Sequence, residues 1–219
     1  MSIIEHGAIG GFSGKTGPVV GARVRGQDTM RAKPRKSTKP KTLKQLVQQA
    51  RFKVITSFIT KAQGIFKIGY QENTGKLTPY NKAFQYHDEH AVMGAYPDFK
   101  IDYAKVKWTD ENRYLWLQMM TEEVVTPLPL YKVKIDWTNI EAGDLDKSNG
   151  TDVAKFLFYS PTRDMYILAP DVTRATETVT ATLPRLFAES DIHGCVFFVS
   201  QDGQELSATT YLGLIKLQA

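Results

Sequence analysis

The glycine-rich segment Gly10-Gly11-Phe12-Ser13-Gly14-Lys15-Thr16 ends in the Gly-Lys-Thr of a phosphate-binding loop. In such a loop, backbone amides and the lysine hold the phosphates of a nucleotide at the start of a helix. The pattern requires a glycine at position 9, where this chain has Ile9, and Gly17-Pro18 follows where the helix should begin. We therefore predict no nucleotide or other cofactor, and we assign these glycines to sharp turns and close backbone packing.

Histidine and acidic residues occur in two segments where a metal site can be considered. His87 and His90 stand three residues apart beside Asp88 and Glu89, so both imidazoles would lie on one face of a helix. No third ligand group is evident elsewhere, and polar helix ends commonly have this composition. The acidic segment 141–147 is similar in spacing to part of a calcium loop but lacks the glutamate that completes one. We predict no metal ligands in either segment.

Nucleophilic catalysis has no recognisable constellation in this sequence. The one cysteine, Cys195, lies in the apolar run 195–199 and has no assignable histidine partner. No Gly-x-Ser-x-Gly elbow occurs. We expect Cys195 to be a small buried core residue, and we predict that the protein has no catalytic residues and is not an enzyme.

Basic residues at the end of the glycine-rich region are the strongest candidates for contact with a partner. Pro34 and Pro40 interrupt this segment, so it should be an extended arm rather than a helix. Such an arm can neutralise phosphates, but residues 31–51 contain no aromatic side chain that could stack on bases. It can also bind an acidic surface of a neighbouring subunit. The predicted assembly or polyanion contacts are Arg31, Lys33, Arg35, Lys36, Lys39, Lys41, Lys44 and Arg51.

Formal charge is divided unevenly along the chain. Residues 1–70 contain 14 of the 28 Lys and Arg residues but only two acids, Glu5 and Asp28, which gives +12. Residues 71–219 contain the other 14 basic residues and 21 acids, which gives −7. This asymmetry favours either a polyanionic partner for the front of the chain or head-to-tail association of its copies.

The composition is that of a globular protein. The 219 residues are 42% hydrophobic and 11% aromatic, which excludes a disordered chain. The longest apolar stretches are too short to span a bilayer, and the N-terminus lacks the basic and apolar regions of a signal peptide. We therefore expect no membrane span, no evident small-molecule substrate, and a cytoplasmic location by default, with association with a particle as the alternative.

Residues 42–95 have helical periodicity. Apolar residues recur at spacings of three and four from Leu43 to Phe66, which predicts a long amphipathic helix. Pro79 suits the first turn of a second, shorter helix that extends to about Ala91. Together these elements predict a two-helix hairpin.

After Tyr96 the period changes to two, which is typical of β-strands. Turn signals such as Ser148-Asn149-Gly150 separate short strands without intervening helices. This spacing predicts an antiparallel β-sandwich of immunoglobulin or fibronectin III type, and Trp137 fits the core tryptophan of such sandwiches. A further strand or hairpin is expected within 17–26. The predicted strands are 99–108, 113–120, 130–137, 153–159, 165–168, 176–183, 193–200 and 207–217.

The chain is thus predicted to be an α+β protein with three parts. A Gly-rich and basic arm comprises residues 1–41, a helical hairpin comprises residues 42–95, and a β-sandwich domain comprises residues 96–219.

Motifs along most of the chain can be compared with known families. They are Gly10-Gly11-Phe12-Ser13-Gly14-Lys15-Thr16-Gly17, Met30-Arg31-x-x-Pro34, Thr42-x-Lys44-Gln45-x-x-Gln48-Gln49-x-Arg51-Phe52 and Tyr96-Pro97-Asp98-Phe99-x-Ile101-Asp102-Tyr103. Through these motifs the chain resembles an uncharacterised Bacteroidota protein family that is known only as a domain of unknown function. The resemblance implies the same division into arm, helices and β-domain, and it brings no catalytic residue, cofactor or substrate.

The charge asymmetry, the extended arm and the lack of a catalytic constellation favour a non-enzymatic structural or assembly protein. Its copies would form a homomeric filament, ring or virion-type particle that is held partly by the N-terminal arm. The alternative is a non-specific nucleic-acid-binding protein that uses the same arm and the basic face of the first helix.

Overall fold

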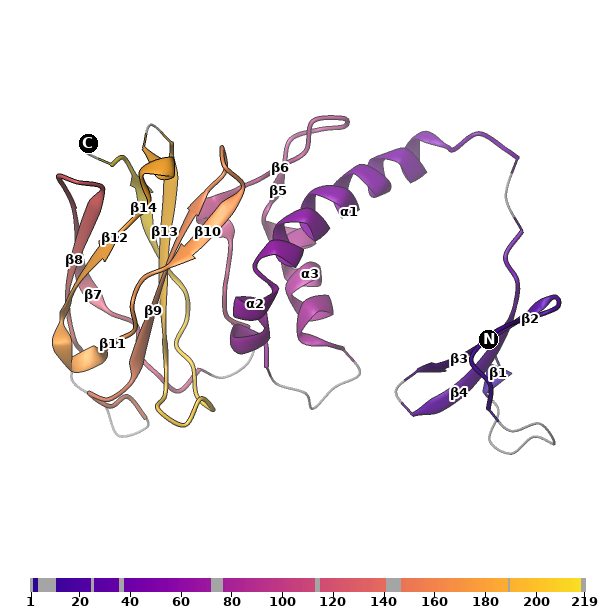
Figure 1. Cartoon of the computed structure of the whole chain (residues 1–219), viewed down its shortest axis with the longest axis horizontal. Coiled ribbons are helices and arrows are strands. Elements are labelled where there is room, and N and C mark those ends of the chain that lie inside the picture. Colours follow the sequence, from indigo (N-terminus) through magenta and orange to yellow (C-terminus); the bar gives the residue numbers. More distant parts are fainter. Residues whose placement is uncertain are drawn as a thin grey trace. The chain divides into compact units, whose positions relative to one another are not determined.

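The computed structural model comprises two compact units, Met1–Thr42 (unit 1) and Leu43–Ala219 (unit 2) (Figure 1). It describes residues 2–3, 11–24, 26–35, 38–71, 77–112, 115–140, 147–188 and 190–217.

Unit 1 is a small antiparallel sheet with the strand order β1-β4-β3-β2. Its strands are β1 (Ser2–Ile3), β2 (Gly14–Thr16), β3 (Val19–Val24) and β4 (Gln27–Ala32). Of the strand or hairpin expected within 17–26, the strand is confirmed as β3, which forms a hairpin with β4 beyond that range, and Val24 pairs with Gln27. Gly26 lies in the turn of this hairpin at φ +79°, a conformation that residues with a Cβ atom rarely adopt. Lys15 and Thr16 belong to β2, and the next element along the chain is the strand β3.

Three helices begin unit 2, namely α1 (Leu43–Lys61), α2 (Gln63–Gly69) and α3 (Pro79–His90). The single long helix that the apolar pattern predicts is therefore divided at Ala62, where the backbone leaves helical geometry at ψ 23°. The second predicted helix is confirmed: Pro79 occupies its first turn, and the Thr78 hydroxyl accepts a hydrogen bond from the Asn81 amide at 3.3 Å.

Two antiparallel sheets follow the helices and face each other. One contains β7 (Thr121–Leu128), β8 (Lys132–Thr138) and β12 (Thr178–Thr182) in the order β12-β8-β7. The other has the order β10-β9-β13-β14, and β11 also pairs with β9. Its strands are β9 (Val153–Ser160), β10 (Met165–Leu168), β11 (Val172–Thr173), β13 (Ile192–Val199) and β14 (Thr210–Ile215). The predicted α+β class, with an immunoglobulin/fibronectin III-like antiparallel sandwich, is confirmed.

Two of the predicted strands are wrong. Segment 99–108 contains only the two-residue β6 (Lys100–Ile101), which pairs with β5 (Val92–Met93), and then a 3₁₀ turn at Tyr103–Lys105. Within 113–120, the described residues form only an isolated bridge at Leu117. The neighbouring strand β7 was missed because Pro127, which cannot donate to a ladder, argues against a strand. β7 tolerates the proline because it is an edge strand of its sheet.

Strands β9 and β13 are buried on both faces. Phe156, Phe158 and Phe198 belong to a core between the two sheets, together with Trp137 of β8. Leu157, Cys195 and Phe197 point the other way, into a second core that they share with the helices. Trp137 and Cys195 are thus core residues, as predicted, and each is 4% exposed.

The helices consequently form a third layer on the outer face of the β9–β13 sheet. Phe58 of α1 joins the layers, since its ring contacts Phe66 and Trp108 as well as Tyr159 of β9. At the end of α2, Gly69 lies so close to the Trp108 carbonyl oxygen that a Cβ atom there would be only 1.7 Å from it. The sandwich and the helices therefore share one continuous interior.

Candidate functional site

The predicted contact residues of unit 1 lie on its surface. Arg31 is an exposed residue of β4, and Lys33 and Arg35 follow that strand and are also exposed. The Lys33 amide donates to the Pro18 carbonyl at 2.8 Å, which extends the sheet by one residue. Lys39 and Lys41 are exposed as well, whereas Lys36 lies outside the described residues.

The two predicted contact residues of α1 differ in their surroundings. Lys44 is exposed in the first turn. Arg51 instead faces α3, where its Nε donates to Asp88 Oδ1 at 3.0 Å. Its guanidinium also lies 5.7 Å from the centre of the Phe99 ring. The charge of Arg51 is therefore already balanced by Asp88 within unit 2.

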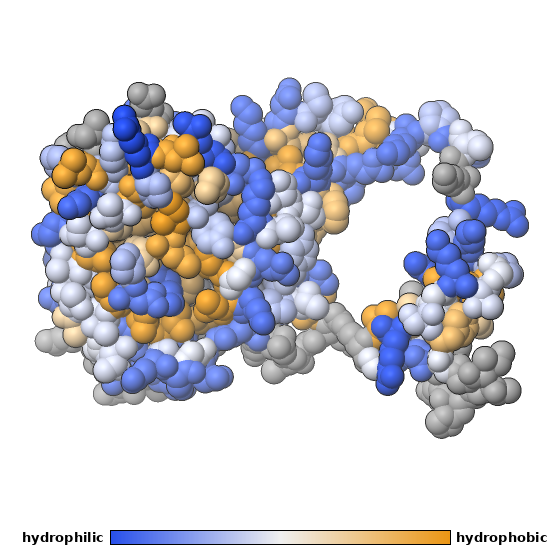
Figure 2. All heavy atoms as spheres, viewed as in Figure 1, coloured by the Kyte–Doolittle hydropathy of each residue, from blue (hydrophilic) through white to orange (hydrophobic). Residues whose placement is uncertain are grey.

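A groove of about 930 Å³ lies along α1. Its first wall is a stripe of α1 residues spaced four apart, Leu46, Ala50, Val54 and Phe58. Its second wall is the β5–β6 hairpin with the residues after it, and its end is the β9–β10 turn. These parts contribute Met93, Tyr96, Pro97, Phe99, Ile101, Tyr103, Tyr159 and Pro161. We refer to this feature as the α1 groove. Apolar side chains lie among the charged ones along α1 (Figure 2).

The polar groups at the end of the α1 groove neutralise one another. The Tyr159 hydroxyl donates to Asp164 Oδ1 at 2.6 Å, and Lys61 forms an ion pair with the same carboxylate. Burial, and after it the neighbouring Tyr103, raises the pKa of Tyr159 well above the ordinary tyrosine value. Burial also raises the pKa of Tyr103. Both hydroxyls therefore remain protonated at neutral pH and can donate hydrogen bonds.

Two lysines of the α1 groove form no ion pair among the described residues. Lys53 of α1 and Lys100 of β6 both line it, and neither forms an ion pair with any residue that the structure describes. The α1 groove is thus apolar and aromatic along its walls and positively charged where these two ammonium groups lie. Sequence reasoning missed it. The sequence signal was the apolar pattern that begins at Leu43, and in the structure the buried residues of α1 start only at Ile55.

His87 and His90 do not converge on a common site. His87 is fully buried, and its Nδ1 lies 2.6 Å from the Ala83 carbonyl oxygen. His90 is exposed and stacks on Tyr86. Over the described parts of the chain, no group of three potential ligands is placed to hold a metal ion. Most of the acidic segment 141–147 lies outside the described residues.

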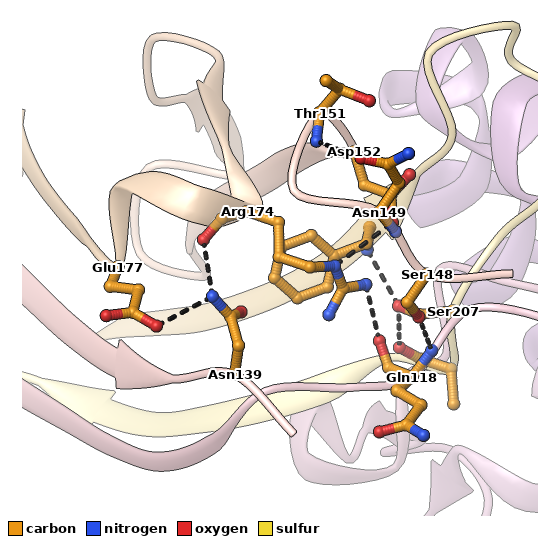
Figure 3. Close-up of polar contacts among 11 residues, drawn as sticks. Gln118, Asn139, Ser148, Asn149, Thr151, Asp152, Arg174, Glu177 and Ser207 are labelled. Carbon is orange, nitrogen blue, oxygen red and sulfur yellow. Dashed lines mark hydrogen bonds and ion pairs between the residues drawn. The ribbon is translucent and has the colours of Figure 1, made fainter. Parts of the chain in front are cut away.

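Arg174 and Asp152 form a buried ion pair at one end of the sandwich (Figure 3). Arg174 Nε donates to Asp152 Oδ2 at 3.2 Å, and its Nη2 donates to the Gln118 carbonyl at 2.8 Å. The guanidinium lies 3.7 Å from the centre of the Phe198 ring. Asp152 Oδ2 also accepts from the Asn149 amide at 2.8 Å. The ion pair thus connects the segments around Gln118, Asn149 and Arg174 to one another and to Phe198 in the core.

A comparison with sequence families matches residues 11–213 to a family of unknown function, DUF6266. The chain belongs to this family. The match includes residues of both units. No curated protein matches the sequence.

Solved structures similar to this DUF6266 chain include two fibronectin type III domains. The fn3 domain of human collagen alpha-1(XX) chain is 13% identical with a TM-score of 0.34, over 46% of this chain and 84% of that domain. The fn3 domain of human contactin 1 is 11% identical with a TM-score of 0.32, over 46% of this chain and 77% of that domain. Among the described residues, no helix has the length and apolarity needed to cross a membrane.

Proposed function

We propose that this DUF6266 chain is a non-enzymatic assembly subunit whose unit 1 binds a neighbouring copy. The observation that carries this proposal is how few of the described residues of unit 1 are buried. Where burial is described in unit 1, only Gly21 and Thr29 are buried. A sheet of short strands is stable only when its apolar face packs on another structural element or another chain. A segment of this size rarely supplies that packing partner by itself.

Charge supports the same proposal. Residues 1–42 contain nine Lys and Arg residues and two acids, whereas residues 43–219 contain 19 basic residues and 21 acids. A basic unit is attracted to an acidic surface on another copy. Contacts of this head-to-tail kind repeat from one copy to the next, so they produce a ring, or an open filament if the rotation does not close. A virion-type particle is a further form of such an assembly.

The test is the oligomeric state of the full chain as a function of salt. At tens of micromolar protein we expect oligomers in 50 mM NaCl that weaken in 500 mM NaCl, measured by sedimentation velocity, because salt screens the contact. Deleting residues 1–42 should give a monomer whose circular dichroism shows that unit 2 remains folded. A full-length protein that is monomeric in low salt would refute the proposal.

The alternative function, non-specific nucleic-acid binding, is favoured by the exposure of the basic residues in unit 1. It can be separated from assembly by changing Lys33, Arg35, Lys36, Lys39 and Lys41 together to Gln. A nucleic-acid binder should lose affinity for duplexes of every sequence, and its salt slope should fall by about one unit per lost phosphate contact. An assembly arm should lose the oligomer instead, while the unchanged protein does not retain DNA or RNA at about 150 mM salt.

A further inference from the structure

We propose that the α1 groove binds a long-chain carboxylate, with its alkyl chain along the apolar stripe of α1 and its headgroup at Lys53 and Lys100. This site goes beyond the proposed assembly function and does not depend on it. The proposal rests on the size of the groove, its apolar walls and its unbalanced positive charge.

The dimensions and lining fit an alkyl chain. A volume of about 930 Å³ lies within the range of about 300–1,000 Å³ that is typical of small-molecule sites. The stripe from Leu46 to Phe58 runs for about 18 Å at 1.5 Å per residue, which accommodates an extended dodecyl chain. Phe58, Phe99 and Tyr103 supply apolar ring surfaces along this path.

Electrostatics select the headgroup. The one acid of the lining, Asp164, is already bound by Lys61 and the Tyr159 hydroxyl. Lys53 and Lys100 are left as ammonium groups without an ion pair to any described residue. A carboxylate is attracted to these lysines, whereas a quaternary ammonium group of equal chain length is repelled.

The same charges argue against unit 1 of a second copy as the occupant. Unit 1 contains nine basic residues and two acids, so its approach would add positive charge next to two ammonium groups. A small amphiphilic anion satisfies both the apolar walls and the cations. The proposal therefore commits to that ligand.

The experiment is isothermal titration of the full chain with dodecanoate below its micelle concentration. Octanoate tests chain length, and dodecyltrimethylammonium is the control of opposite charge. We expect saturable binding of dodecanoate. Octanoate should bind much more weakly, because each buried methylene contributes up to about a fourfold factor in the binding constant. Dodecyltrimethylammonium should not bind. The double variant Lys53→Gln/Lys100→Gln should weaken dodecanoate binding by about three- to tenfold.

Two more variants locate the site. Ala50→Trp adds an indole to the wall of the α1 groove and should abolish dodecanoate binding. Lys44→Gln removes an exposed charge on the same helix outside the groove and should leave binding unchanged. No saturable binding, equal binding of dodecyltrimethylammonium, or affinity that these variants do not alter would each overturn the proposal. If dodecanoate does not bind and Ala50→Trp disrupts the oligomer, the groove is a subunit contact: this proposal fails and the assembly function stands.

Discussion

Two buried polar side chains of unit 2, Arg174 and His87, are accommodated in different ways. Arg174 is 4% exposed and keeps its charge, because Asp152 and the Phe198 ring surround it. His87 is fully buried, and no described residue forms a hydrogen bond with its Nε2. Burial lowers the pKa of His87 to about 4, so its ring is neutral in the folded protein.

Arg174→Met should destabilise unit 2 by about 3–5 kcal/mol, because it leaves the Asp152 carboxylate buried without its partner. The double variant Arg174→Met/Asp152→Leu should lose less stability than Arg174→Met alone, since it removes both charges. Urea unfolding followed by fluorescence measures both values. Arg163→Met, at an exposed position of the β9–β10 turn, is the matched control and should change stability by less than about 0.5 kcal/mol. Equal losses from Arg174→Met and Arg163→Met would contradict this assignment.

His87 should make the protein sensitive to acid. The unfolded chain binds a proton at this residue below pH 6.5, but the folded protein does so only below about pH 4. The free energy of unfolding should therefore decrease as the pH falls from about 6.5 to 4, by an amount on the order of 3 kcal/mol, and then level off.

The variant His87→Phe tests this expectation, because a phenyl ring keeps the packing against Phe58 and Phe66 but cannot titrate. Its unfolding free energy should lose most of the slope between pH 6.5 and pH 4. His90→Gln is the control on the same helix, where the side chain is exposed. A slope that persists in His87→Phe would assign the acid sensitivity to other groups.

At the scale of elements, α1 has two halves with different roles. Its buried residues, Ile55, Phe58 and Ile59, all lie in the second half, where the helix packs on the β9–β13 sheet. Its first half contributes Leu46 and Ala50 to the α1 groove and keeps Leu43 66% exposed. One amphipathic pattern thus serves both a core and an open surface.

Phe58→Ala and Phe52→Ala compare these roles within one helix. Phe58 is 4% exposed, and its ring contacts Trp108 and Tyr159 of β9. Phe58→Ala should therefore lower the free energy of unfolding by about 3–5 kcal/mol. Phe52 is 54% exposed, and the centre of its ring lies 5.2 Å from that of Phe84. Phe52→Ala should therefore lower the free energy of unfolding by about 1 kcal/mol or less. Thermal unfolding of the two variants measures this difference, and similar losses of stability would show that α1 is not anchored through Phe58.

At the scale of the whole molecule, the helices and the sandwich of unit 2 are one folding unit. Without α1–α3, the β9–β13 sheet would expose Leu157, Phe197 and Val199 to water. The boundary between residues 95 and 96, which the change of period suggests, therefore runs through a shared core.

Fragments provide the corresponding prediction. A fragment of residues 43–219 should give a cooperative thermal transition. A fragment of residues 96–219 should aggregate or bind a hydrophobic dye, because one face of its central sheet has lost its cover. Circular dichroism and dye fluorescence on the two fragments measure this difference. A soluble, cooperatively folding 96–219 fragment would show that the helices are dispensable for the sandwich.

The sequence by itself determined the α+β class, helix α3 and most strands of the sandwich, including β10, whose bounds at residues 165–168 agree with the prediction. These features follow from local periodicity and turn residues, which a single chain displays directly. The apolar run 195–199 also indicates that β13 is buried on both faces, because a strand whose residues do not alternate between apolar and polar has no face suited to solvent.

Only the tertiary structure decided which surfaces stay open. The α1 groove needs a helix stripe, the β5–β6 hairpin and the β9–β10 turn, which come from separate parts of the chain. The pairing of Lys61 with Asp164, the one acid among the groove-lining residues, likewise depends on a contact distant in sequence. Among the described residues, Lys53 and Lys100 of the groove form no ion pair. Periodicity reports which side of an element is apolar, but only the packed fold specifies what covers that side and which charges meet there.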